Sequence, residues 1–75
     1  MTLYDPGPEH RPLTARQLEV LRLLRDVSRR RAVAAALGVS LHTARHHIKA
    51  LYERLGVHDR TQAVMAGIQR GWIEL

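Results

Sequence analysis

The sequence predicts an all-α fold, a small domain of four short helices. Apolar residues recur at helical spacing in several segments, and these segments begin with residues that cap helices and end at glycines. Apolar residues make up 45% of the chain but aromatic residues only 4%, so the core has to rest on Leu, Val, Ile and Ala. That composition suits closely packed helices. With 75 residues, the chain can hold only one small core.

The N-terminal segment 1–12 contains three prolines and a glycine among polar residues, and we interpret it as a flexible arm or linker. The domain then covers residues 13–75. Its first helix begins after Thr14, because Thr14 and Gln17 have the spacing of a capping box. A broad apolar face follows, which predicts packing against more than one neighbour. This face consists of Leu18, Val20, Leu21, Leu23 and Leu24.

A second helix is expected at about 30–37, after a short break. Arg29, Arg30 and Arg31 stand at its N-terminus, where the helix dipole disfavours positive charge unless an anion binds there. Gly38 can adopt a positive φ in the tight connection to the next helix. The order of a small residue, a turn glycine, an apolar residue and a capping residue is typical of a helix-turn-helix.

The third helix is predicted at 41–55, with Ser40 as its N-cap and Gly56 just beyond its end. Its two faces differ in chemistry. The apolar stripe holds Ala44, Ile48, Leu51 and Leu55, and the opposite face holds His42, Arg45, His46, Lys49 and Glu53. A helix with one core face and one basic face predicts a helix that lies in the major groove of DNA.

A fourth helix is expected at about 61–70, because Asp59 and Gln62 form another plausible capping box and Gly71 follows. One face carries small residues, and a second face carries Gln62, Met65 and Gln69. Trp72, just beyond the helix, is interpreted as a plug that closes the core.

The composition restricts the function classes. Twelve Lys and Arg against seven Asp and Glu give a net charge of +5, which suits a polyanionic partner but is also ordinary for a small soluble domain. The absence of Cys excludes disulfides, thiolate metal sites and a thiol nucleophile. No apolar run approaches the ~20 residues of a membrane span, and the first residues do not resemble a signal peptide. We therefore expect a cytoplasmic protein without membrane contact.

Enzymatic and metal-binding functions are not expected. Ser28 and Ser40 are explained by a turn and a cap, and so small a domain offers little room for a substrate pocket. His42 and His46 are four residues apart on one helix face, a spacing at which both could bind zinc. No carboxylate stands between them and no third ligand is evident, so the sequence predicts no metal site and no cofactor.

Taken together, residues 13–73 resemble the LuxR-type, or GerE-like, helix-turn-helix domain of quorum-sensing regulators and NarL-like response regulators. The resemblance rests on ordered motifs: Leu13-Thr14-x-Arg16-x-x-Glu19-Val20-Leu21, Leu37-Gly38-Val39-Ser40-x-x-Thr43, His47, Leu55-Gly56-Val57, Arg60-Thr61-Gln62-Ala63-Val64 and Gly71. The chain departs from the family pattern at Val27, Ala32 and Ala44, where the family usually has Gly, Glu and a larger aliphatic residue.

The resemblance implies a transcription regulator whose third helix binds double-stranded DNA. By position, Arg45, His46 and Lys49 would face bases, and Arg30, Arg31, Ser40, Thr43 and His42 would contact phosphates. The fourth helix would form a weak homodimer on an inverted repeat, through Gln62, Met65 and Gln69. The resemblance leaves RNA polymerase open as a further partner.

Two alternatives remain open at this point. One is a protein-interaction module that keeps the fold and modulates related regulators by dimerisation. Such a module would not require Arg45 and Lys49 on the basic face of the third helix. The other is RNA binding, which the shortage of aromatic residues for base stacking disfavours.

Overall fold

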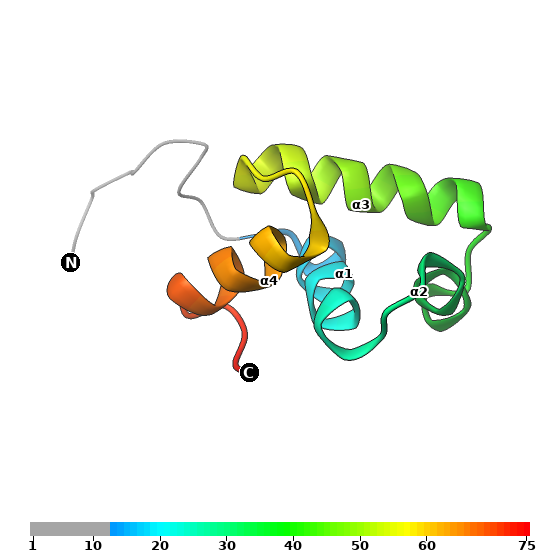
Figure 1. Cartoon of the computed structure of the whole chain (residues 1–75). Coiled ribbons are helices and arrows are strands. Elements are labelled where there is room, and N and C mark those ends of the chain that lie inside the picture. Colours follow the sequence, from blue (N-terminus) through cyan, green and yellow to red (C-terminus); the bar gives the residue numbers. More distant parts are fainter. Residues whose placement is uncertain (1–12) are drawn as a thin grey trace.

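The computed structural model describes residues 13–75 of the chain. Four helices occupy most of this range: α1 (Ala15–Asp26), α2 (Arg30–Leu37), α3 (Leu41–Leu55) and α4 (Arg60–Gln69) (Figure 1). No strand occurs within residues 13–75. The predicted all-α class with four helices is confirmed, whereas the predicted arm at 1–12 lies outside the described residues.

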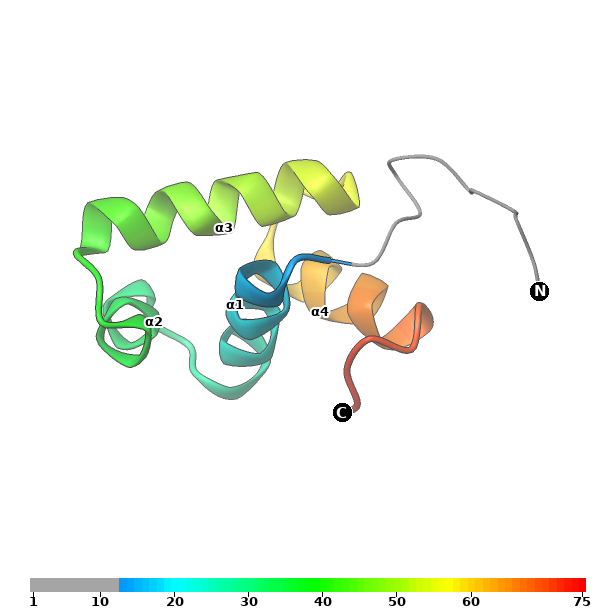
Figure 2. The ribbon, with the colours of Figure 1, turned by 180° about the vertical axis from the view of Figure 1, so that it is seen from behind.

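The arrangement places α3 along one side of the domain and the other three helices beneath it (Figures 1 and 2). Helix α1 lies in the middle and packs against α2, α3 and α4. Such a central position explains why the apolar face of α1 is broader than a single stripe. One long face of α3 is therefore left on the outside of the domain.

Local capping sets the helix boundaries. At the start of α1, the Gln17 backbone N–H donates to Thr14 Oγ1 at 3.0 Å, and the Thr14 N–H donates to Gln17 Oε1 at 3.0 Å. This is the predicted capping box. Helices α2 and α3 end at Gly38 and Gly56, whose φ angles of 71° and 72° are left-handed. The bounds of α2 and α3 agree with the sequence prediction because both ends of α3 and the end of α2 are encoded locally.

The fourth helix differs in detail from the prediction. It begins at Arg60, one residue earlier than expected, and ends at Gln69. Asp59 caps it by accepting from the Gln62 N–H at 2.8 Å. The Gln62 side chain does not complete a capping box, because its Oε1 accepts from the His58 N–H at 2.8 Å instead. The side chain thus reaches into the α3–α4 connection and stabilises that turn.

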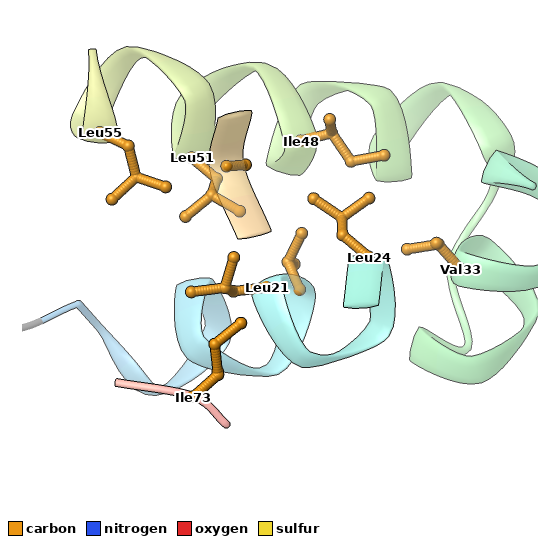
Figure 3. Close-up of a cluster of buried hydrophobic side chains, with 9 residues drawn as sticks. Leu21, Leu24, Val33, Ile48, Leu51, Leu55 and Ile73 are labelled. Carbon is orange, nitrogen blue, oxygen red and sulfur yellow. The ribbon is translucent and has the colours of Figure 1, made fainter. Parts of the chain in front are cut away.

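The core lies between α3 and the helices below it (Figure 3). Leu21 and Leu24 of α1 face Ile48 and Leu51 of α3, and Val33 extends the cluster to α2. Burial of each such side chain contributes about 1.5–3 kcal/mol. Ala44 is fully buried, so the small residue at this family-atypical position is part of the interface beneath α3.

Helix α4 is held against α1 by two contacts that lack a local sequence pattern. A Cβ at Gly67 would lie 2.7 Å from Leu21 Cδ2 and 3.0 Å from Ile73 Cγ1, so any larger residue would force these side chains to shift. Arg60 Nε donates to the Leu24 carbonyl at 2.5 Å, near the C-terminus of α1. An arginine there satisfies a helix carbonyl and opposes the negative end of the helix dipole.

The C-terminal segment closes the same side of the domain. Arg25 Nη1 donates to the Glu74 carbonyl at 2.8 Å, while its Nε donates to Asp26 Oδ1 at 2.7 Å. This hydrogen bond from Arg25 lowers the pKa of the Asp26 carboxyl. Trp72 packs against the core but stays half-buried, and the Arg70 guanidinium lies 5.2 Å from its ring centroid. Ile73, rather than Trp72, is the fully enclosed residue of this segment.

Candidate nucleic-acid interface

The outer face of α3 carries the side chains that the sequence assigned to bases. Arg45, His46 and Lys49 are exposed, as is His42 one turn earlier. These four side chains line one open hollow. Within residues 13–75, no hydrogen bond or ion pair occupies Arg45 or Lys49, so both cations remain available to an external acceptor. Helical periodicity, which buries Ala44 and Ile48, forces these residues outward.

The N-terminus of α3 holds two of the predicted phosphate contacts. Ser40 Oγ accepts from the Thr43 N–H at 3.1 Å, and its hydroxyl donates to Thr43 Oγ1 at 3.1 Å. Ser40 therefore uses its proton inside the cap, whereas the Thr43 hydroxyl proton is left to donate outward. The first-turn N–H groups and the dipole of α3 also favour an anion at this end.

His42 and His46 form a pair. Their Nε2 atoms are 3.2 Å apart, and the rings meet edge to face with centroids separated by 4.6 Å. The sequence assigned His42 to phosphate and His46 to bases, and placed both on one face of the helix. The structure brings the two imidazoles together, so they act as one polar group on this face.

The arginine cluster lies at the start of α2. Arg29, Arg30 and Arg31 are all exposed, and α2 has no side-chain cap at this end. Arg30 lines a hollow together with Arg45 and Lys49 of α3. The basic surface is therefore continuous from α3 to the N-terminus of α2. Arg31 is exposed but does not line this hollow.

Tyr52 is a residue that sequence reasoning did not single out. It lines the hollow of Arg30, Arg45 and Lys49, and it also lines a cleft of about 190 Å³ between the helices. Burial raises the pKa of its hydroxyl, which keeps the phenol neutral and able to donate. The available signal was its position, since Tyr52 follows the buried Leu51 at the edge of the apolar stripe, where an aromatic residue is half-buried.

The predicted dimer face on α4 divides into two parts. Met65 is 53% exposed and lines an apolar hollow of about 260 Å³. Val64 and Ile68 also line this hollow, and neither was in the sequence prediction. Gln62 and Gln69 are exposed but do not line it, and Gln62 is engaged by the His58 N–H.

A family model for bacterial regulatory proteins of the luxR family matches residues 11–66. The chain belongs to the luxR family. The predicted family membership is thereby confirmed, and this family consists of transcription regulators with a DNA-binding domain rather than enzymes. Residues 11–66 therefore form a domain of the kind that DNA-binding transcription regulators of this family carry.

Three curated relatives show the extent of the similarity. The transcriptional regulatory protein DegU of Brevibacillus brevis is 38% identical over 63 residues, covering 84% of this chain and 27% of DegU. DesR of Bacillus subtilis is 33% identical over 70 residues, covering 93% of this chain and 35% of DesR. The spore germination protein GerE of Bacillus subtilis is 38% identical over 63 residues, covering 84% of this chain and 85% of GerE. The luxR-family chain thus spans about a third or less of DegU and DesR but most of GerE. No solved structure matches significantly.

Two further features of this luxR-family domain concern metals and membranes. Across residues 13–75, no group of three or more His, Cys, Asp or Glu side chains is arranged to hold a metal ion. In the same range, every helix is too short or too polar to span a bilayer.

Proposed function

We propose that this luxR-family domain binds double-stranded DNA in a sequence-specific manner, with α3 in the major groove. The observation that carries the proposal is the outer face of α3, where Arg45 and Lys49 are exposed and make no hydrogen bond or ion pair with residues 13–75. A helix fits the major groove, which is about 12 Å wide. Buried side chains on the opposite face fix the orientation of α3 relative to the domain.

The roles follow from chemistry and position. Arg45 and Lys49 would donate to guanine O6 and N7, and His46 would contact a neighbouring base edge. Thr43 and His42 at the start of α3 would contact phosphates, as would Arg30 and Arg31 at the start of α2. Ser40 would do so by turning its hydroxyl proton from Thr43 Oγ1 to a phosphate oxygen. Phosphate contacts at two helix termini would set the register of α3, since they position the protein without selecting a sequence.

Dimerisation on DNA would use α4. The exposed Met65 and the apolar hollow beside it support a small self-complementary contact, together with Gln62 and Gln69 at its edge. Two copies related by a two-fold axis would bind an inverted repeat. Because the patch is small, we expect a monomer in free solution and two copies per duplex. We expect a cytoplasmic location, because the bacterial chromosome lies there. RNA polymerase is a further expected partner.

The decisive test starts with selection of binding sites from random duplex DNA, for which we expect an enriched inverted repeat. On that site, Arg45→Ala should cost about 1–3 kcal/mol and relax the base preference at one position. Arg22→Ala, which removes the same charge from an exposed position on α1, serves as the matched control and should have little effect. Binding titrations at several salt concentrations measure both.

The salt dependence separates this proposal from a protein-interaction module. The logarithm of the affinity should fall linearly with that of salt, with a slope of about −0.9 per phosphate neutralised. A flat salt response, or no enriched sequence, would contradict DNA binding and favour the interaction module. Equal losses for Arg45→Ala on all sequences would reassign Arg45 to phosphate.

A further inference from the structure

The His42–His46 pair has a geometry that the fold itself does not require. Both side chains are exposed on α3, outside the buried stripe of that helix. The two Nε2 atoms nevertheless lie 3.2 Å apart and share a hydrogen bond. Their backbone positions are fixed because both residues lie within a regular helix. Two imidazole nitrogens held this close form a preorganised donor pair.

We propose that His42 and His46 together bind one divalent transition-metal ion, Cu²⁺, Ni²⁺ or Zn²⁺, through their Nε2 atoms. A metal–nitrogen bond of about 2.0–2.1 Å places two ligands roughly 3.3 Å apart in a tetrahedral shell and roughly 2.9 Å apart at a right angle. The observed separation of 3.2 Å lies within this range. To bind the ion, the proton of the Nε2···Nε2 hydrogen bond would move to Nδ1 of its ring, and both rings would turn so that the two Nε2 lone pairs converge on one point.

A site with two protein ligands is an exchangeable site. Residues 13–75 offer no group of three metal-binding side chains, so water would complete the coordination shell. Imidazole ligands favour transition metals over Mg²⁺ and Ca²⁺, and affinity should rise from Ni²⁺ to Cu²⁺. Arg45 and Lys49 line the same hollow and repel a cation, which keeps the affinity below that of an isolated pair.

Metal binding has a consequence for DNA, and this step rests on the proposed function. The ion would take the Nε2 atoms of both histidines and would place its hydrated shell over the outer face of α3. His46 could then no longer reach a base edge. Metal and DNA would therefore compete for the same face of the helix.

The first experiment measures metal binding without DNA. Titration of the whole chain with Ni²⁺, and separately with Cu²⁺, should give one saturable ion per chain. Either His42→Ala or His46→Ala should weaken binding by about a hundredfold, because the remaining imidazole loses its preorganised partner. His58→Ala is the matched control, since His58 is an exposed histidine outside the pair, and His10→Ala tests the N-terminal segment. Both controls should retain wild-type affinity.

The salt dependence is a further readout of the pair's surroundings. Added salt should strengthen binding by screening Arg45 and Lys49. Circular dichroism checks that each variant is folded. Binding unchanged in both His42→Ala and His46→Ala, or absent in wild type, would overturn the proposed site.

The second experiment adds duplex DNA carrying the selected site. Ni²⁺ should weaken DNA binding by the wild type, a chelator should reverse this, and His42→Ala should be insensitive to Ni²⁺. Unchanged DNA affinity at saturating Ni²⁺ would overturn the competition. If no duplex binds at all, the proposed function fails, while the metal isotherm still decides the metal site.

Discussion

The two halves of this domain use their polar side chains differently. In the α2–α3 half, exposed Arg45 and Lys49 contribute nothing visible to the described fold, and Arg30 joins them on one surface. In the α1–α4 half, Arg60 caps a carbonyl of α1 and Gln62 accepts from the α3–α4 connection. One half leaves Arg45 and Lys49 available for a ligand, and the other uses polar groups to hold its helices together.

The difference between the halves gives a way to distinguish binding residues from structural ones in a small basic domain. Both halves are rich in charged and polar residues, so composition does not distinguish them. What distinguishes them is whether a side chain has an intramolecular partner. Polar groups that already have partners stabilise the fold by about 0.5–1.5 kcal/mol each. Exposed groups without partners are the ones that an external anion can engage.

The largest expected loss of stability comes from Gly67→Val in the α1–α4 half. The valine side chain would overlap Leu21 Cδ2 and Ile73, and such overpacking costs about 1–3 kcal/mol. Urea denaturation measures the free energy of unfolding. The matched control is Ala50→Val on the exposed side of α3, where the same residue should cost only about 0.5 kcal/mol through helix propensity. Equal losses in the two variants would contradict the close approach of α4 to α1.

The second prediction compares the loss of one cation from each half. Arg60→Ala should lower the free energy of unfolding by about 1 kcal/mol, because the Leu24 carbonyl loses its donor. Lys49→Ala should leave stability within about 0.5 kcal/mol, since exposed side chains without partners contribute little. Thermal and urea unfolding of both variants make the comparison. The division between the halves would fail if Lys49→Ala were the more destabilising change.

The third prediction, with an expected loss of stability no larger than that of Arg60→Ala, concerns Ser40, which caps α3 and also lies in the proposed interface. Ser40→Ala removes the cap of α3 and should cost about 1 kcal/mol of stability. It should also weaken DNA binding modestly and equally on all duplexes, because a phosphate contact carries no sequence preference. Ser40→Asp keeps the cap but adds a negative charge, so it should retain stability while losing DNA affinity. A stable Ser40→Asp variant with unchanged DNA binding would remove Ser40 from the interface.

Several features of the fold could be predicted because their causes are local. Capping residues stand within three positions of the N–H groups they accept from, as Thr14 and Ser40 do, and the glycine that follows a helix lies next to its end. The buried stripe of α3 follows from a period of 3.6 residues. The outward position of Arg45 and Lys49 follows from the same period.

Features of the α1–α4 half could not be predicted in the same way. The Asp59 and Gln62 spacing suggested a full capping box, yet the Gln62 side chain has a competing donor at His58. The hollow formed by Val64, Met65 and Ile68 also depends on Leu75 beyond the helix and on Arg25, which is distant in sequence. No local pattern identifies such combinations.

The sequence alone determined the helix count, the boundaries of α2 and α3, the helix-turn-helix and the face of α3 that points outward, because capping and periodicity act over a few residues. Three contacts could not be predicted from the sequence: Gly67 packs against Leu21 and Ile73, Arg60 donates to a carbonyl of α1, and Arg30 joins the surface of Arg45 and Lys49. Each of these contacts joins residues of different helices, and its geometry depends on how those helices pack. The His42–His46 pair lies between the two cases: its spacing was visible in the sequence, but the rotamers that bring the rings together were not.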